Sequence, residues 1–524
     1  MQIIIPMSGQ SSRFSNAGFK LPKPLITVDN ILMIEHVKNM FASDDMFLFI
    51  CTHEQLNDKT FKLREKLLNL NINSKIIGID SHNMGPVYSV LQITSHIDFQ
   101  SPVIVNYCDF SCDWSYDDFK NFVESKNLDG AIPCYKGFHP HTLWSNYYAY
   151  VKEKNLKAID IQEKESFTNN PRMEYASSGT YYFKSGKLMI HYFKNLYENN
   201  VCVNGEFYVS LAYKKMIKDG LNISVYKLNH FMQWGTPEDL RDYQYWSNTF
   251  SNLHSKNKKC SFNGTIFMPM SGEGKRFQKK YSEIKPLIKI NNKPMFVNSF
   301  EYLPESKNRY VIVNNHQIQF EIENNYSIYM ANTHLININQ KTNGQAVTCY
   351  EALNNIELNE PITISARDFG TIYESSELSD LLDDINVDII VWTAVGYPGA
   401  IRTPKSYGWV EIDKKTNEIK KVKVKEKLND PSTDHVIVGT FSFKKNEYFL
   451  KCYDSLIKRN FKVNGEYYVD SLINDAINLG YKCKIFEVKS YICWGTPDDL
   501  DTFNYWDNCF DNWKYHPYSK KTLS

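Results

Sequence analysis

The sequence has almost no excess of charge of either sign. Its 60 lysine and arginine residues balance 59 aspartate and glutamate residues, which leaves a formal net charge of +1. Such a chain offers no overall field that would attract nucleic acid or an anionic membrane surface. We therefore expect no nucleic-acid partner, and any affinity for phosphate groups must come from local sites.

Long apolar runs are also missing. Nowhere do about eighteen apolar residues follow one another, so we expect no membrane-spanning helix. The run Ile3–Ile5 is too short for the core of a signal peptide. The 11 cysteines are scattered without a Cys-x-x-Cys pair, which argues against a zinc site and favours reduced thiols. Together these features predict a cytoplasmic protein.

What the sequence does contain is enough apolar material for more than one core. Of its 524 residues, 42% are hydrophobic and 14% are aromatic. A single hydrophobic core stops growing at about 250–300 residues, so at least two domains are expected.

Four sequence blocks occur twice, in the same order. Each second copy follows the first by about 260 residues, so the repeating unit has the size of a domain rather than of a solenoid repeat. The polar stretch between the copies is typical of a linker. We therefore predict domains over residues 1–250 and 264–524, joined by a linker over residues 251–263. The blocks are Ile5–Phe14 and Met268–Phe277, Lys23–Ile26 and Lys285–Ile288, Val203–Val209 and Val463–Val469, and Trp234–Leu240 and Trp494–Leu500.

Within each repeat, short apolar runs alternate with segments of helical spacing. This alternation predicts an α/β domain of three layers, with a mainly parallel central sheet and ligands bound at the carboxyl ends of its strands. After Asp109 the pattern becomes mixed and aromatic, which fits an inserted antiparallel part that includes Tyr147–Val151 and Gly179–Phe183. The strands predicted before it are Gln2–Pro6, Met46–Cys51, Lys75–Ile79 and Val103–Asn106, with helices at Asn30–Phe41, Phe61–Leu70 and Pro86–Ile97; the second repeat has strands at Thr265–Met268, Val311–Asn314 and Ile362–Ser365.

A loop of small residues, Ser8–Arg13, directly follows the first predicted strand. Its backbone amides could cradle a polyphosphate, with Arg13 as a bidentate cation. The loop matches neither the Walker pattern nor the dinucleotide fingerprint, and by itself it could equally be a structural turn.

Lys23 lies ten residues further on, between Pro22 and Pro24. Stiff prolines reduce the freedom that the lysine would lose on meeting a phosphate. Lysine is more commonly a solvated surface residue, but its return as Lys285 beside Pro286 favours a functional role.

The ordered motifs Pro-Met-Ser-Gly-x-x-x-Arg-Phe, Lys-Pro-Leu-Ile, Asn-Gly-Glu-Phe/Tyr-Tyr-Val and Trp-Gly-Thr-Pro-Glu/Asp-Asp-Leu resemble those of the sugar-phosphate nucleotidyltransferase family. The resemblance is nearest to the branch found in gene clusters for capsule and surface polysaccharides. It covers nearly the whole chain, once per repeat, and it is specific for the family but not for a substrate. It implies two tandem Rossmann-like domains of the nucleotide-diphospho-sugar transferase type.

The resemblance also implies roles for individual residues. Arg13 and Arg276 would clamp the triphosphate, Lys23 and Lys285 would contact the reacting phosphates, and Asp109 and Asp368 would bind Mg²⁺. Nucleotide contacts would come from Ser8, Gly9, Ser11, Ser12 and Gly85 in the first repeat, and from Ser271, Gly272, Gly274 and Gly344 in the second. The acceptor would be bound by Glu163, Lys164, Gly179 and Glu206, and by Glu426, Lys427, Gly439 and Glu466.

The implied reaction transfers a nucleotidyl group from CTP, UTP or dTTP to a sugar 1-phosphate or another small phosphorylated acceptor, with release of pyrophosphate. An acceptor phosphate is already an anion near neutral pH, so no serine, cysteine or histidine nucleophile is needed. What the enzyme must supply is alignment and the screening of negative charge.

One departure from the family pattern leaves alternatives open. Many members carry a second metal-binding aspartate where this chain has Gln233 and Cys493. Either the metal is held by Asp109 or Asp368 alone, or another acid substitutes, or turnover is weak. Two other functions therefore stay open at this point: a nucleotide-binding regulatory domain without catalysis, and a glycosyltransferase that uses a nucleotide-sugar. The oligomeric state is open as well.

Other motifs have structural interpretations. The pair His139 and His141 has no partner cluster, so a metal site there is not favoured. The lysine-rich run Lys420–Lys427 alternates with valine, which indicates the solvated face of a strand. The acids Glu238, Asp239, Asp498 and Asp499 fit the first turns of capped helices.

Overall fold

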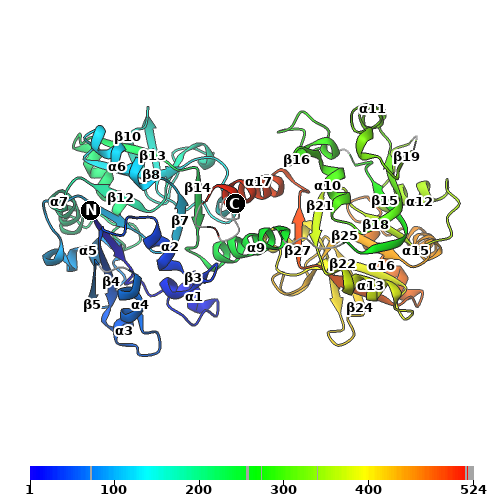
Figure 1. Cartoon of the computed structure of the whole chain (residues 1–524), viewed down its shortest axis with the longest axis horizontal. Helices are drawn as coiled ribbons and strands as arrows, with labels where there is room; N and C mark the ends of the chain where they lie inside the picture. Colours follow the sequence, from blue (N-terminus) through cyan, green and yellow to red (C-terminus); the bar gives the residue numbers. More distant parts are fainter. Residues whose placement is uncertain (71–72, 255–258, 273, 339, 514–515, 517–524) are drawn as a thin grey trace. The chain divides into compact units, whose positions relative to one another are not determined.

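The computed structural model describes residues 1–70, 73–254, 259–272, 274–338, 340–513 and 516 (Figure 1). Contacts divide the chain into a first unit, Met1–Ser247 with Tyr505–Ser524, and a second unit, Asn248–Asn504. The divisions fall within α9 (Pro237–His254) and α17 (Pro497–Asn512). Of the predicted linker, residues 251–254 belong to α9 and residues 261–263 to β15, while residues 255–258 lie outside the described part.

The first unit is built on a ten-stranded sheet with the order β11-β9-β10-β13-β8-β12-β6-β1-β4-β5. Strands β6, β1, β4 and β5 are parallel, as predicted. Their bounds are β1 Gln2–Pro6, β4 Met46–Thr52, β5 Ser74–Ile79, β6 Val103–Asn106, β8 Gly130–Tyr135, β9 Tyr150–Lys154, β10 Lys157–Gln162, β11 Tyr175–Ser177, β12 Thr180–Phe183 and β13 Ile223–Lys227, with β7 Phe110–Asp113 and β14 His230–Gln233 forming a separate pair.

Both faces of this sheet are buried. Ile4 of β1 belongs to one apolar cluster, together with residues of α5, α7 and α8. Its neighbours Ile3 and Ile5 belong to another cluster, with residues of α2, α4 and α6. Because successive strand residues point to opposite faces, this division shows three layers. The helices are α1 Ser12–Asn16, α2 Met33–Asn39, α3 His53–Asn57, α4 Leu63–Leu70, α5 Gly85–Gln92, α6 Tyr116–Ser125, α7 Gly186–Glu198 and α8 Val209–Lys218.

The second unit repeats this topology. Its main path, β19-β18-β15-β20-β25-β22-β26, matches β5-β4-β1-β6-β12-β8-β13 strand for strand. The strands are β15 Ser261–Pro269, β18 Glu305–Val313, β19 Thr333–Asn337, β20 Ile362–Ser365, β21 Phe369–Ile372, β22 Ile389–Ala394, β23 Gly408–Ile412, β24 Ile419–Val424, β25 His435–Phe443, β26 Cys483–Glu487 and β27 Ser490–Cys493. The helices are α10 Met295–Glu301, α11 His316–Asn325, α12 Gln345–Leu353, α13 Ser375–Asp383, α14 Pro398–Arg402, α15 Asn446–Lys458 and α16 Val469–Asn478.

The segment Gly179–Phe183 differs from its prediction. It forms β12, which lies in the central sheet and pairs antiparallel with β6 and β8. The inserted antiparallel part is made by β9, β10 and β11 at the edge of the sheet. A strand buried on both faces and an inserted strand have similar apolar sequences, so pattern alone does not separate them.

Three smaller expectations can be compared with the coordinates. No helix in the described part of the chain is long and apolar enough to cross a membrane. All 11 cysteines are free thiols. Of the run Lys420–Lys427, only the part up to Val424 lies on β24, where Lys420 and Lys421 are exposed and Val422 is buried. This part agrees with the interpretation as the solvated side of a strand, whereas Lys425–Lys427 follow the strand.

Candidate active sites

The first unit holds Lys23 and Asp109 in direct contact. Lys23 opens a short 3-10 turn, Lys23–Leu25, whose Pro24 and Leu25 are buried and so anchor the lysine backbone. Asp109 follows β6, and its Oδ2 lies 2.7 Å from the Lys23 ammonium, with each side chain 20% exposed. Burial acts to lower the pKa of Lys23, but the Asp109 carboxylate outweighs that effect, and the pKa is raised overall. The ammonium therefore stays charged throughout the neutral range.

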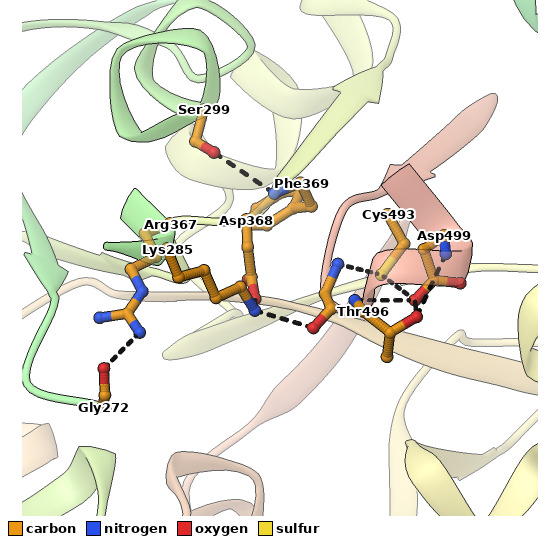
Figure 2. A network of polar contacts seen from close by, with 10 residues as sticks. Gly272, Lys285, Ser299, Arg367, Asp368, Phe369, Cys493, Thr496 and Asp499 are labelled. Atoms are coloured by element: carbon orange, nitrogen blue, oxygen red, sulfur yellow. Dashed lines mark hydrogen bonds and ion pairs between the residues drawn. The ribbon is translucent and has the colours of Figure 1, made fainter. Parts of the chain in front are cut away.

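The second unit repeats this contact between Lys285 and Asp368 (Figure 2). The two groups are 2.5 Å apart, and Lys285 also donates to the backbone carbonyl of Gly495 at 2.8 Å. Burial acts to raise the pKa of Asp368, but the Lys285 charge and hydrogen bond more than offset it, so the carboxylate pKa is lowered. A Cβ on Gly274 would come within 2.7 Å of the Lys285 side chain, so this glycine makes room for the lysine.

The loop after β1 and the turn before α5 enclose a cleft of about 510 Å³ in the first unit. Gly85 has a φ of +83°, and a Cβ there would lie 2.9 Å from the amide nitrogen of Phe207. This close approach joins α5 to the Asn-Gly-Glu segment through hydrogen bonds from Phe207 to Met84 and from Val87 to Phe207. All five predicted nucleotide contacts of the first unit line this cleft: Ser8, Gly9, Ser11, Ser12 and Gly85.

A second cleft of about 570 Å³ is lined by both Lys23 and Asp109, as is the first. The predicted acceptor residues gather in it. Arg13, predicted to clamp the triphosphate, lines this second cleft instead of the first. The acceptor residues that meet here are Glu163, Lys164, Gly179 and Glu206.

Two short hydrogen-bond chains hold these acceptor residues. Lys164 donates to the hydroxyl of Tyr208, which donates to Glu206, each at 2.5 Å. Glu163 accepts from the Ser210 hydroxyl at 2.5 Å. Burial raises the pKa of Glu163 despite that bond and the nearby Lys164. These three residues therefore place one cation beside two carboxylates, each held by a neighbouring side chain.

Gln233 lies beside Asp109, at the place of the missing second aspartate. The pairing of β14 with β7 sets Gln233 opposite Phe110, the residue after Asp109. A Cβ on Gly235 would meet Gln233 Nε2 at 2.8 Å and Asp109 Oδ2 at 3.1 Å, so both groups border the same small space. In the described part of the chain, no group of three or more His, Cys, Asp or Glu residues could hold a metal by itself. A single carboxylate next to a phosphate cleft still fits Mg²⁺, which often takes one or two carboxylates and fills its shell with phosphates and water.

The sequence interpretation missed several lining residues. Several aromatic side chains line the second cleft, yet no motif separated them from the core aromatics. Thr236 caps α9, since its hydroxyl accepts a hydrogen bond from the backbone amide of Asp239 at 3.1 Å. Asp239 therefore lies in the first turn of the helix, as the helix-cap interpretation expects. It also lines the cleft, where burial raises its pKa to about 7. The aromatic lining residues include Tyr107, Trp144, Tyr147, Tyr148, Tyr181, Tyr208 and Phe231.

His139 and His141 are buried and belong to the packing around Tyr135. The His141 Nε2 lies 2.9 Å from the Tyr135 hydroxyl. Burial lowers the pKa of His139 to about 3, so it is neutral.

In the second unit, a cleft of about 500 Å³ contains Ser271, Gly272, Gly274 and Gly344, together with Asp368 and Glu466. Arg367 stands where the first unit has Cys108, and its guanidinium donates to the Gly272 carbonyl at 2.7 Å (Figure 2). Its position next to Asp368 was visible in the sequence, but its reach to the loop was not.

The predicted acceptor pair Glu426 and Lys427 is displaced by two residues. Glu426 is 70% exposed and ion-paired with Lys423 at 3.0 Å, and Lys427 is exposed. Lys425 takes the place that Lys164 has in the first unit, with a left-handed φ of 58° against 61°. Gly439 does match Gly179, since each accepts a hydrogen bond from the residue two before the active-site aspartate, Ala366 and Tyr107 respectively.

Comparison with known proteins identifies the family. The nucleotidyl transferase family model matches two successive segments, residues 2–239 and 270–476. No curated protein matches the chain. Similar solved structures include a nucleoside-diphosphate-sugar pyrophosphorylase from Vibrio cholerae RC9 (23% identity, TM-score 0.38, 46% of this chain and 99% of that chain). Others are the inositol-1-phosphate CTP transferase from T. maritima (14%, 0.38, 47% and 96%) and a UDP-glucose pyrophosphorylase from Acinetobacter baumanii (16%, 0.37, 49% and 94%). With both segments matched, the chain belongs to the nucleotidyl transferase family.

Proposed function

We propose that this protein transfers a nucleotidyl group from a nucleoside triphosphate to a small phosphorylated acceptor and releases pyrophosphate. One observation carries the proposal: two adjoining clefts in the first unit share Lys23 and Asp109 as lining residues. A nucleotide in one cleft and an acceptor in the other would therefore meet at this pair.

In the proposed reaction, an oxygen of the acceptor phosphate attacks the α-phosphorus of the nucleotide. A new P–O–P linkage forms, the bond between the α-phosphorus and the bridging oxygen breaks, and that oxygen leaves with pyrophosphate. The residues of this chain would align the two phosphates and offset their charge, Lys23 at the junction and Arg13 on the acceptor side. No side chain has to gain or lose a proton.

Asp109 and Asp368 would hold Mg²⁺, which screens phosphate charge when bound. Lys23 and Lys285 ion-pair with these carboxylates and would then turn toward the phosphates. A lysine with three rotatable donors can make this change over a short distance.

We further propose CTP, UTP or dTTP as the nucleotide and a sugar 1-phosphate or a similar phosphomonoester as the acceptor. The names of the similar structures, a nucleoside-diphosphate-sugar pyrophosphorylase and an inositol-1-phosphate CTP transferase, support this range. A role in the cytoplasmic synthesis of precursors for capsule or surface polysaccharide accords with the motif resemblance. The shared strand order of the two units supports duplication of one ancestral domain.

The test is pyrophosphate release by the full chain with Mg²⁺, each nucleotide and a panel of phosphomonoesters. We expect activity with at least one pair. Lys23→Ala and Lys285→Ala should each lower the rate of pyrophosphate release by one unit about 10²–10³-fold, because each removes a cation from the reacting phosphates. The matched control is Lys20→Ala, an exposed lysine of the same loop. No pyrophosphate from any combination, or full activity in the double variant, would refute the proposal.

A further inference from the structure

One lysine in each unit has the same backbone conformation and the same neighbours. Lys164 and Lys425 both have left-handed backbones, and their amides donate to Tyr148 and Tyr407 at 3.0 and 2.9 Å. Their ammonium groups lie 4.5 and 5.7 Å from the ring centres of Tyr208 and Tyr468. These three agreements fix the correspondence of the two lysines.

Once Lys425 is matched with Lys164, the residues that precede the two lysines differ, because one is acidic and the other is apolar. Glu163 precedes Lys164, whereas Val424 precedes Lys425. The carboxylate of the first site is therefore absent from this position in the second. Ser210, which donates to Glu163, corresponds to Asp470 in the repeated Asn-Gly-Glu block. The acid has moved from the end of a strand to the first turn of α16.

A third position accommodates the exchange. Ala149 of the first unit corresponds to Gly408, since each follows the tyrosine that accepts from the lysine amide. A Cβ on Gly408 would collide with Oδ2 of Asp470, far inside any real Cβ contact. In the first unit the methyl group of Ala149 fills this space, beside the small side chain of Ser210. In the second unit Gly408 has no methyl group, and the Asp470 carboxylate occupies the space instead.

Charge and burial connect Asp470 to Lys425. Asp470 is the acidic group with the largest electrostatic effect on Lys425, ahead of Glu466. Burial raises the pKa of the Asp470 carboxyl and lowers the pKa of the Lys425 ammonium, and the charge of each group opposes the shift of the other. Asp470 and Lys425 also lie close in the fold, because Gly408, which borders Asp470, pairs with Val424, the residue before Lys425. Arg276, the predicted clamp, is close enough to act on Lys425 as well.

We infer that Lys425 and Asp470 are the lysine and the acid of the acceptor site in the second unit, and that this altered pair makes the two units select different phosphorylated acceptors. The inference rests on the proposed function. Lys425 meets the acceptor phosphate, while Asp470 faces the part of the acceptor that Glu163 contacts in the first unit. Because a carboxylate on a short side chain from α16 approaches from a different element, the same acceptor hydroxyl or amine cannot satisfy both sites equally.

The experiment uses the full chain in two backgrounds. The Lys23→Ala chain reports on the second unit, and the Lys285→Ala chain reports on the first. Initial rates of pyrophosphate release are measured with CTP, UTP and dTTP against glucose 1-phosphate, inositol 1-phosphate and further phosphomonoesters. We expect the ratio of kcat/KM values between acceptors to differ by about tenfold or more between the two backgrounds, the size of one charge-assisted hydrogen bond.

In the Lys23→Ala background, Lys425→Met and Asp470→Asn should each raise the KM for the acceptor by about tenfold, with the KM for the nucleotide nearly unchanged. Lys421→Met, an exposed lysine of the same strand, is the matched control. Glu426→Gln and Lys427→Met test the pair that the family resemblance implied, and they should leave the acceptor KM unchanged. Thermal unfolding with and without nucleotide verifies that each variant is folded.

The triple variant Gly408→Ala, Val424→Glu, Asp470→Ser gives the second unit the residues of the first. It should stay active and shift its acceptor preference toward that of the Lys285→Ala chain. Three results would overturn the inference while leaving the proposed function intact: equal acceptor preference in both backgrounds, an acceptor KM that responds to Glu426 or Lys427 instead, or an inactive second unit in an active protein. Absence of pyrophosphate from the unmodified chain would instead refute the proposed function itself.

Discussion

The hydroxyl of Tyr505 lies 2.9 Å from both the amide nitrogen and the carbonyl oxygen of Phe231. Tyr505 is the first residue of the C-terminal segment that belongs to the first unit. Phe231 lies on β14, two residues before Gln233, and lines the acceptor cleft. The end of the chain therefore supports a strand that borders the candidate site of the first unit.

Tyr505→Phe should destabilise the first unit by about 1–3 kcal/mol, because it leaves the backbone groups of Phe231 without a partner. Chemical denaturation of the full chain measures the effect. Tyr197→Phe is the matched control: Tyr197 is 44% exposed in the same unit, and its ring contacts survive the change. For the same reason, a chain ending at residue 250 should be less stable than the first unit within the whole protein. Equal stability of the two tyrosine variants would contradict this role of Tyr505.

The raised pKa of Asp239, about 7, has a consequence for stability. A carboxyl with a pKa above its unfolded value binds more protons when folded, so folding loses stability as pH rises from about 4 to about 7 and is unaffected above that. Asp239→Asn keeps an oxygen for Thr236 and removes this titration. The difference between the melting temperature of the variant and that of the wild type should increase in favour of the variant as pH rises from 5 to 7. Above pH 7 the difference should stay constant. A gap that does not change with pH would be inconsistent with a protonated Asp239.

Two glycines separate the effect of backbone conformation from that of close approach. Gly85 and Gly220 have almost the same φ, 83° and 84°, but a Cβ at Gly220 would meet nothing within 4 Å. Gly220→Ala should cost only the left-handed backbone penalty, about 1–2 kcal/mol. Gly85→Ala should cost more, because its Cβ would press on Phe207, and it should also weaken the stabilisation of the protein by nucleotide. Similar losses of stability and of nucleotide response in both variants would show that the close approach is unimportant.

Arg367 should strengthen nucleotide binding by the second unit, because it fixes the loop carbonyl of Gly272 and adds positive charge to the cleft. In the Lys23→Ala background, Arg367→Cys should raise the nucleotide KM by about tenfold, the effect of one charge-assisted hydrogen bond. Lys289→Ala removes an exposed charge from the same unit and serves as the control. An unchanged nucleotide KM in Arg367→Cys would mean that the arginine serves only to hold the loop.

Much of the fold was predictable, because periodicity reflects burial directly. The strand Gln2–Pro6 was confirmed to the residue, and Val103–Asn106 likewise. Helix ends were less certain: Asn30–Phe41 was predicted, whereas α2 spans Met33–Asn39 after a short hairpin. Two-residue strands are too short to leave a periodic signal.

The candidate site, like the fold, was predictable in some parts and not in others. Lys23 and Asp109 were each identified from a local motif, and the structure brings them into contact over 86 positions of sequence. Lys425 was not singled out because it lies in a run of alternating lysines, where spacing does not reveal which one takes the place that Lys164 has in the first unit. Lys425 differs from Lys423 and Lys427 in its left-handed backbone, its amide hydrogen bond to Tyr407 and its approach to the Tyr468 ring.

The sequence by itself determined the repeat, the α/β class and the motif residues of each site, since these depend on local pattern and on the chemistry of side chains. Only the tertiary structure decided where Arg13 lies, which lysine of the second unit matches Lys164, and to which unit Tyr505 belongs. These depend on the packing of segments far apart in the chain, and long-range packing leaves no periodic trace in the segments themselves.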